Sequence, residues 1–336
     1  MTFAIAPMTA EHVPESAALL DRWYARARRP RALPAGGQAE SPYTYEELVA
    51  KLLAGPGTEA VAARGSRGRL SGYLVVSPDE PGSGDRLDEH SHPRSALVAH
   101  GGHALHPGRE PEVLREMYAA VAERFVARGR LVHHVDLPAD DSVAMAWFRL
   151  GFGLERIRGL MPVKASGRQP RGVDGLAIRR ASPADLGPVG RMAAESAGYR
   201  QHAAIFQPQP QEVLQQLRTR YTEALADPHS AAWLAVRRGE EAGMVVLTPV
   251  PPGPFTPESA VELVEAYVEP NARGEGVSRV LLATALAWAY DRGYRHITAN
   301  WPTGSPLAAG HWPALGFTPV SYRLCRVIDS RLSQGT

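Results

Sequence analysis

The alternation of apolar and polar positions around residue 260 predicts a strand that leads into a helix. Residues 261–268 are rich in β-branched and aromatic side chains, which is typical of a strand. Over residues 277–292 apolar side chains recur at helical spacing, and Gly293 then ends the helix. The short segment between the two elements contains Gly274 and Gly276. Glycines at such a connection let the backbone turn tightly and approach a ligand closely.

The start of this predicted helix has the properties of an anion site. The first backbone N–H groups of a helix have no partner within it, and the helix dipole favours negative charge there. Arg273 adds a fixed positive charge beside them. An ordinary strand-to-helix turn is the alternative for the two glycines alone. We expect a pyrophosphate to be held by five residues of this segment: Arg273, Gly274, Gly276, Val277 and Ser278.

Two segments of the second half resemble motifs of the GCN5-related N-acetyltransferase (GNAT) family. Val268-Glu-Pro-Asn-Ala-Arg-Gly-Glu-Gly-Val-Ser278 is similar to the family's coenzyme A loop. His311-Trp-Pro-Ala-Leu-Gly-Phe317 is similar to its Phe-Tyr-x-x-x-Gly-Phe element, and the two occur in the family's order and at about its spacing. The resemblance implies an acyl-CoA-dependent N-acyltransferase that uses acetyl-CoA or another acyl-CoA.

The chain also repeats itself, which is a reason to expect one fold used twice. Each copy has a proline and two glycines at equal intervals of 22 or 23 residues: Pro107, Gly129 and Gly151 in the first copy, and Pro270, Gly293 and Gly316 in the second. We therefore expect an α/β (α+β) protein of two tandem GNAT folds, each a mixed, mostly antiparallel sheet flanked by helices. The expected domains are residues 1–163 and 176–336, joined by a polar linker at 164–175.

The first copy lacks the glycine loop of the second. It has His106-Pro-Gly-Arg-Glu-Pro-Glu112, with one glycine and two acidic residues where a pyrophosphate would lie. Acidic side chains suit a first helical turn but repel a phosphate. We expect a non-catalytic copy, with or without a structural acyl-CoA held by Leu105, Gly108 and Arg109. Tandem members of the family often have one active and one degenerate half.

The reaction implied by the resemblance is acyl transfer from a thioester to an amine. In this family the thioester carbonyl is held by backbone N–H groups, which here belong to Tyr267 and Val268. Alkyl amines have a pKa near ~10, so the amine needs a base. Glu265, and after it Glu262, are the candidates. Because they are three residues apart in a strand, we expect them on opposite faces, with Leu263 and Tyr267 on the face of Glu265.

The proton donor for the leaving thiolate is harder to assign from the sequence. The family often has a tyrosine four residues before the glycine of Gly-Phe, and here that position is Trp312. An indole is no acid at neutral pH, so we expect Trp312 to pack on the pantetheine arm instead. His311, Tyr322 and Ser305 are the candidate substitutes, and a thiolate that leaves unassisted is the alternative. Asn300 corresponds to a family residue that contacts the pantetheine arm; a turn-forming asparagine is the alternative.

Composition excludes several classes of function. The 336 residues carry a net charge of +2, which gives no field for nucleic acid or an anionic membrane. No apolar run reaches the ~18 residues of a membrane span. The single cysteine, Cys325, rules out an internal disulfide and suits the cytoplasm. No metal is expected, because three candidate ligands fall on alternating faces of a predicted strand: His100, His103 and His106.

The sequence does not identify the acceptor. The segment at 193–227, which would shape its site, has no acidic cluster that would suit a polycation. We therefore expect a small-molecule amine, and a monomer or homodimer. Two loops, at 29–43 and 77–95, are rich in proline and glycine, and the first is a candidate contributor to binding. Tandem family members act in mycothiol synthesis and in antibiotic biosynthesis. A non-catalytic acyl-CoA-binding or sensing protein is the alternative.

Overall fold

The structure, a computed structural model, consists of two compact units. These are Met1–Ile157 with Val320–Thr336, and Arg158–Pro319. The residues that the structure describes are 3–28, 44–66, 68–79, 95–165, 172–202, 204–207 and 211–333, without the side chains of 211–214. The loop at 29–43, most of the loop at 77–95 and half of the expected linker lie outside these residues.

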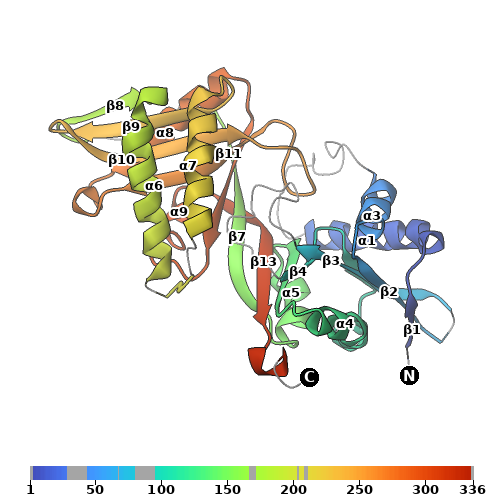
Figure 1. Cartoon of the computed structure of the whole chain (residues 1–336). Coiled ribbons are helices and arrows are strands. Elements are labelled where there is room, and N and C mark those ends of the chain that lie inside the picture. Colours follow the sequence, from blue (N-terminus) through green and yellow to red (C-terminus); the bar gives the residue numbers. More distant parts are fainter. Residues whose placement is uncertain are drawn as a thin grey trace. The chain divides into compact units, whose positions relative to one another are not determined.

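The first unit is a sheet covered by helices. Its strands follow in the spatial order β1 (Ala4–Pro7), β2 (Glu59–Arg64), β3 (Leu70–Asp79), β4 (Ser95–Val98), β6 (Val132–Pro138) and β13 (Thr318–Val327), and β5 (His103–Leu105) also pairs with β3. Figure 1 shows α1 (Val13–Arg28) and α3 (Tyr45–Leu53) on one side of this sheet, and α4 (Glu110–Ala127) and α5 (Asp141–Phe148) on the other. Short 3-10 turns are η1 (Ala10–His12) and η5 (Ser330–Ser333).

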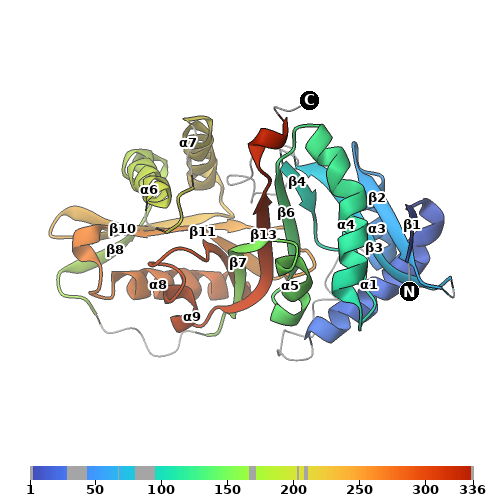
Figure 2. The ribbon, with the colours of Figure 1, turned by 90° about the horizontal axis from the view of Figure 1, so that it is seen from below.

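The second unit repeats this plan. Its strands follow in the order β7 (Gly153–Pro162), β12 (His296–Pro302), β11 (Ala260–Val268), β10 (Glu240–Pro249), β9 (Ala231–Arg237) and β8 (Leu176–Arg180). Figure 2 shows α6 (Leu186–Gln201) and α7 (Gln211–Ala226) on one face, and α8 (Val277–Asp291) and α9 (His311–Ala314) on the other. The 3-10 turns are η3 (Pro183–Asp185) and η4 (Pro270–Ala272). Strand β11 pairs in parallel with β12, whereas β10 pairs antiparallel with β11 and with β9, and β9 antiparallel with β8. The expected mixed, mostly antiparallel fold is confirmed.

The last strands do not follow the division expected from the sequence, at 1–163 and 176–336. β13, the last strand of the second copy, pairs antiparallel with β6 in the first unit, with Leu324 opposite Val135. β7, the last strand of the first copy, is a neighbour of β12, and beyond it Val163 N donates to Arg295 O over 2.8 Å. Because the two copies are similar, a last strand can pair at the sheet edge of either copy. The repeat in the sequence therefore does not predict which sheet each last strand joins.

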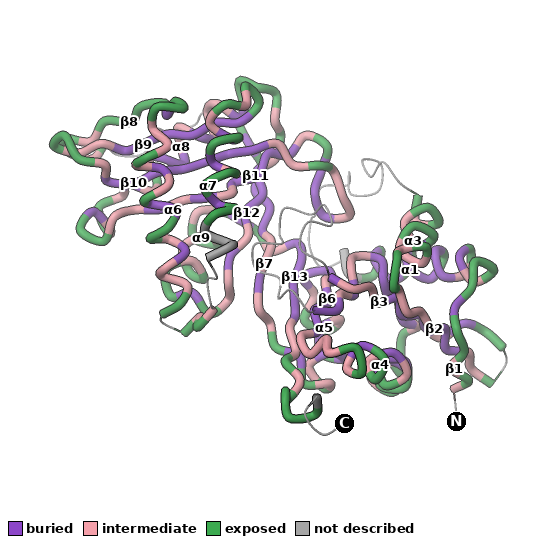
Figure 3. The backbone as a smooth tube through the Cα atoms, viewed as in Figure 1, coloured by how far each residue is buried: buried purple, intermediate pink, exposed green. Residues whose placement is uncertain are grey.

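The core of the second unit lies between its sheet and the helices α6 and α7. Met192, Tyr221, Leu234 and Met244 are almost completely buried there, and Tyr267 of β11 joins them. Burying one large apolar side chain contributes about 1.5–3 kcal/mol. Figure 3 shows buried backbone along the central strands and exposed backbone on the outer helix faces. Among the described residues, none of the helices is both long and apolar enough to cross a membrane.

Candidate functional site

A β-bulge interrupts strand β11 at the centre of the site. Val246 of β10 pairs with Glu265, but the next residue, Leu247, pairs with Leu263, so Val264 has no partner of its own. An extra residue of this kind bends a strand and reverses the side on which the following side chains lie. The bulge therefore changes which residues of β11 share a face.

The bulge corrects the faces expected from the sequence. Glu262 pairs with Thr248 and Glu265 with Val246, and these two partners lie two residues apart on β10 and so on one face. Glu262 and Glu265 therefore lie on the same face, which α6 and α7 cover, and Leu263 lies on the opposite one. The expectation of opposite faces was wrong because strict alternation was assumed across residue 264. The expectation that Tyr267 shares the face of Glu265 is confirmed.

Beyond the bulge, β11 leaves its parallel neighbour. The pairing with β12 ends at Leu263 and Ala299, so residues 264–268 have no strand partner on that side within the described chain. On the other side, Glu269 N donates to Ala242 O over 3.0 Å. Because antiparallel hydrogen bonds alternate along a strand, the N–H of Tyr267 then points to β10 and that of Val268 to the unpaired side. Of the two expected carbonyl donors, Val268 is the one whose N–H points to the unpaired side.

The loop that follows β11 turns on two glycines with left-handed backbone. Gly274 has φ +79° and Gly276 has φ +95°, and Gly276 is the cap of α8. No side chain caps the helix, and within the described chain the N–H groups of residues 274–278 donate to no carbonyl. A Cβ at Gly274 would meet nothing within 4 Å, so the loop is open at that point. An open row of donors at a helix start fits a phosphate group.

Arg273 is fixed beside this row of donors. Its Nε donates to Val268 O over 2.9 Å, and its guanidinium lies 5.7 Å from the centre of the Tyr267 ring and 6.0 Å from that of Tyr199. Contacts of this kind hold a cation in place without neutralising it. Glu275, the acidic residue of the loop, forms an ion pair with Arg237. The loop therefore keeps a positive charge next to free N–H groups.

Glu265 is buried beneath α6 and α7 and is held by hydroxyl groups. Ser196 Oγ donates to Oε1 and Tyr221 OH to Oε2, both over 3.0 Å, and Arg200 Nη2 lies 3.6 Å from Oε2. Burial, and then the Glu265 carboxylate, raise the pKa of Tyr221 well above its ordinary value, so this hydroxyl stays protonated and donates. Tyr267 does not reach Glu265, because its OH donates to Glu195 over 2.8 Å.

Glu262 belongs to a second polar cluster on the same face. Its Oε1 accepts from Asn300 Nδ2 over 2.8 Å and lies 3.5 Å from Arg158 Nη2. Arg158 also donates to Thr256 Oγ1 over 2.7 Å and to Asn300 Oδ1 over 3.3 Å. Both Nδ2 and Oδ1 of the Asn300 side chain thus already have a hydrogen-bond partner in the protein. Its expected contact with a pantetheine arm stays a prediction.

Trp312 and His311 lie together on the short helix α9. The two rings are 5.1 Å apart, and Trp312 packs edge-on against Phe317 at 5.5 Å. Burial, and then the positive charge of Arg279, lower the pKa of His311, so its neutral form prevails near pH 7. The two alternatives to His311 are otherwise engaged. Ser305 Oγ accepts from Ala308 N, and Tyr322 belongs to the first unit, where its OH donates to Asp141.

In the first unit, the loop at residues 106–112 corresponds to the glycine loop of the second unit, and the carboxylate of its own Glu110 folds back onto it. Leu105 is buried, whereas Gly108 and Arg109 are exposed at the start of α4. Gly108 N donates to Glu110 Oε2 over 2.8 Å, and Arg26 Nη1 lies 3.1 Å from Glu110 Oε1. Burial alone would raise the pKa of Glu110, but hydrogen bonds from its own N–H, Arg26 and Gly108 lower it. A carboxylate thus takes the donor that a phosphate would need.

Two histidines of the first unit, His100 and His103, have structural partners. Trp147, which corresponds to Trp312, is fully buried and donates from Nε1 to His103 Nε2 over 3.1 Å. Burial lowers the pKa of His103 to about 3. His100 Nε2 lies 3.0 Å from Ser321 Oγ. Within the described chain, neither these two nor His106 belongs to a cluster with the spacing of metal ligands.

Several residues of the two clusters escaped the sequence analysis. They are Thr256, Arg158, Ser196 and Arg200. Arg158 comes from β7, which the repeat assigns to the other copy, so no local pattern links it to Glu262. Ser196 and Arg200 are four residues apart on α6, and this spacing, which puts two polar side chains on one helix face, is the signal that would have suggested a shared partner.

Comparisons with known proteins agree with these observations. The pattern of the acetyltransferase (GNAT) family matches residues 199–312. A mycothiol acetyltransferase of Thermobispora bispora is 26% identical over 287 residues, which are 82% of this chain and 86% of that protein. A mycothiol acetyltransferase of Thermomonospora curvata is 30% identical over 261 residues, 75% of this chain and 76% of that protein.

Among solved structures, a GCN5-related N-acetyltransferase from Sphaerobacter thermophilus is similar over 98% of both chains, with a TM-score of 0.59. At 15% identity this likeness shows the fold alone. It extends over both halves of the chain.

Proposed function

Because the chain belongs to the acetyltransferase (GNAT) family and is an N-acetyltransferase, we propose that its second unit transfers the acetyl group of acetyl-CoA to a small-molecule amine. The observation that carries the proposal is the row of unpaired N–H groups at residues 274–278, beside Arg273 and at the end of the bulged strand β11. In the first unit the corresponding N–H of Gly108 donates to Glu110 instead.

The residues of the loop fit the pyrophosphate of an acyl-CoA. Gly274 and Gly276 keep the approach free of side chains, Val277 and Ser278 add the first helical N–H groups, and Arg273 adds charge. Val268, on the unpaired side of β11, has an N–H free to polarise a carbonyl. The acyl-CoA, when bound there, supplies the thioester that the amine attacks.

We assign the role of base to Glu265, directly or through a water, with Glu262 as the second candidate. Each oxygen of Glu265 accepts one hydroxyl and retains a lone pair for an ammonium proton. The amine then attacks directly in a ternary complex. A cysteine acyl-enzyme is disfavoured, because Cys325 lies in the first unit and burial raises its pKa to about 12.

The acceptor is proposed as a small molecule. Two relatives bear the name mycothiol acetyltransferase, which makes an amine precursor of mycothiol the first candidate. An amine of antibiotic biosynthesis is the second, and it rests on the sequence resemblance alone. On α6, the cation of Arg200 lies 3.6 Å from Glu265, so the buried carboxylate already has one positive partner.

The test is amine-dependent release of CoA, followed by mass spectrometry over a panel that includes the amine precursor of mycothiol. Glu265→Gln is expected to lower kcat about 10²–10⁴-fold. Glu262→Gln is compared in parallel, with Glu240→Gln, an exposed carboxylate on β10, as the matched control. A larger loss in Glu262→Gln than in Glu265→Gln would reverse the assignment. Tight acyl-CoA binding without turnover of any amine would favour the non-catalytic alternative.

A further inference from the structure

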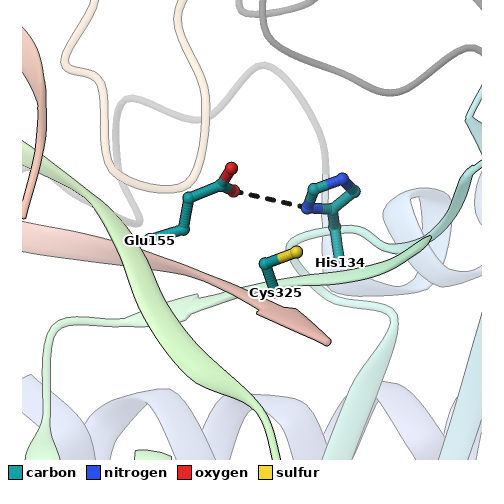
Figure 4. Close-up of side chains that lie close together, drawn as sticks. All are labelled: His134, Glu155 and Cys325. Carbon is teal, nitrogen blue, oxygen red and sulfur yellow. Dashed lines mark ion pairs between the residues drawn. The ribbon is translucent and has the colours of Figure 1, made fainter. Parts of the chain in front are cut away.

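Three side chains of the first unit that take no part in the proposed reaction point toward one another. They come from three strands: His134 from β6, Glu155 from β7 and Cys325 from β13 (Figure 4). His134 and Cys325 are directly opposite in the antiparallel register. One ligand atom from each of the three lies within 4.8 Å of the others. The cluster thus combines nitrogen, oxygen and sulfur, which are the three donor types found at zinc sites.

His134 has no hydrogen bond that explains its burial. Its side chain is 2% exposed, and within the described chain neither ring nitrogen has a hydrogen-bond partner. Glu155 Oε2 lies at an ion-pair distance of 3.4 Å from His134 Nδ1. A buried polar group without a partner costs about 1–3 kcal/mol. A ligand between the three side chains would remove this cost.

The distance between His134 Nδ1 and Glu155 Oε2 suits a shared ion. Two ligands that are each ~2.0–2.1 Å from a tetrahedral zinc lie about 3.3 Å apart. The 3.4 Å between His134 Nδ1 and Glu155 Oε2 agrees with that separation. The sulfur of Cys325 needs a small side-chain adjustment to complete the third contact. A water would then take the fourth position.

The charges balance for a divalent ion. A Cys325 thiolate and a Glu155 carboxylate carry two negative charges, and a neutral His134 adds none. Arg323, two residues from Cys325, is already neutralised, because its Nε and Nη2 donate to Asp136 over 2.8 and 2.9 Å. Arg156 also acts on Glu155. The three ligands and a divalent ion sum to zero, and Arg156 adds a positive charge beside them.

We propose that His134, Glu155 and Cys325 bind a divalent transition-metal ion, with Zn²⁺ as the preferred one. The ion would tie together β6, β7 and β13 of the first unit and stabilise it. Without metal, burial holds the pKa of the Cys325 thiol at about 12, so binding displaces the thiol proton into solvent. The role is structural and independent of acetyl transfer.

The test uses Cys325 as an internal probe, because it is the only cysteine of the chain. The full chain is stripped with a chelator and titrated with Co²⁺ and Zn²⁺. We expect one ion per chain and a thiolate-to-cobalt charge-transfer band, which no other residue can produce. Cys325→Ser is expected to lose this band, and Cys325→Ser and His134→Gln to bind Zn²⁺ about 100-fold more weakly.

The same titration is applied to a control variant, and it can also contradict the proposed metal site. His229→Gln removes an exposed histidine of the second unit and should leave binding unchanged. Zn²⁺ should raise the Tm of the wild type but not that of Cys325→Ser, and circular dichroism verifies that each variant is folded. Absence of the band in wild type, or equal Zn²⁺ affinity in Cys325→Ser, would overturn the proposal and leave a metal-free His–Glu pair.

Discussion

The side-chain amide of Asn300 donates to the carboxylate of Glu262 over 2.8 Å, across the parallel strands β12 and β11. Arg158 approaches the same carboxylate oxygen to 3.5 Å. The buried carboxylate of Glu262 thus has one amide and one cation as partners. Removing either partner leaves the buried carboxylate with one partner fewer. Breaking a buried ion pair in this way is strongly destabilising.

Arg158→Met is therefore expected to destabilise the protein by about 3–5 kcal/mol. The methionine keeps most of the buried volume but leaves Glu262 without its cation. Urea unfolding of the variant and the wild type measures the difference. Arg331→Met is the matched control, because the Arg331–Asp329 pair is exposed on both sides, at 85% and 48%, and should cost less than about 1 kcal/mol. Equal effects of the two changes would contradict the role given to Arg158.

Ser278→Glu is expected to abolish acyl-CoA binding while the fold is kept. Residue 278 lies in the first turn of α8, where a carboxylate stabilises the helix but repels a phosphate. This position is preferable to Gly276, whose φ of +95° makes any side chain strained. Ser278→Gln is the control of equal size. Titration followed by native mass spectrometry should show loss of binding in the glutamate variant alone; binding by both would place the pyrophosphate elsewhere.

The wild-type chain is expected to bind one acyl-CoA, not two. In the first unit the Gly108 N–H is taken by Glu110, and the fully buried Trp147 leaves no room beside His103. Native mass spectrometry with acetyl-, succinyl- and longer acyl-CoAs counts the bound equivalents. Two equivalents in the wild type and one in Ser278→Glu would show that the first unit holds its own acyl-CoA, against this expectation.

His133 is expected to make the protein less stable in acid. Its Nε2 lies 3.1 Å from Arg130 O and its Nδ1 2.6 Å from Tyr118 OH, so the neutral ring donates to the carbonyl and accepts from the hydroxyl. Burial lowers the pKa of His133 from 6.5 to about 4. Above pH 6.5, His133 is neutral in both the folded and the unfolded protein. As the pH falls below 6.5, His133 of the unfolded chain is protonated first, which favours unfolding. Stability attributable to His133 should thus fall between pH 6.5 and 4, by about 3 kcal/mol.

His133→Gln tests this dependence, because glutamine can donate and accept at the same two partners without titrating. Urea unfolding from pH 7 to pH 4 should give a smaller loss of stability in the variant than in the wild type. His103, whose pKa burial lowers to about 3, continues to titrate in both and, with carboxyl groups such as Glu155, contributes to the remaining slope. Parallel pH profiles would show that His133 is not the group responsible.

Much of the fold was predictable because it depends on local patterns. The strand at residues 261–268 and the helix that follows match β11 and α8 closely. The signals that predict them, namely apolar–polar alternation, helical spacing of apolar residues and glycines at the ends of elements, each involve only a few neighbouring residues. The open loop between them also follows from local chemistry, because only glycine adopts positive φ without strain. The repeat of proline and glycine positions predicted two similar sheets for the same reason.

The bulge at Val264 was not predictable, because it depends on how β11 pairs with β10 rather than on its own sequence. It places Glu262 and Glu265 on one face, where alternation had separated them. Their partners come from distant segments, such as Tyr221 on α7 and Arg158 on β7.

The sequence by itself determined the elements, the glycine loop and the family, because these are set by residues close together in the chain. Only the tertiary structure decided which carboxylates share a face, which sheet each last strand joins, and that Cys325 lies beside His134 and Glu155. These are contacts between residues far apart in sequence. They are selected by the packing of whole strands and helices, which no short segment encodes.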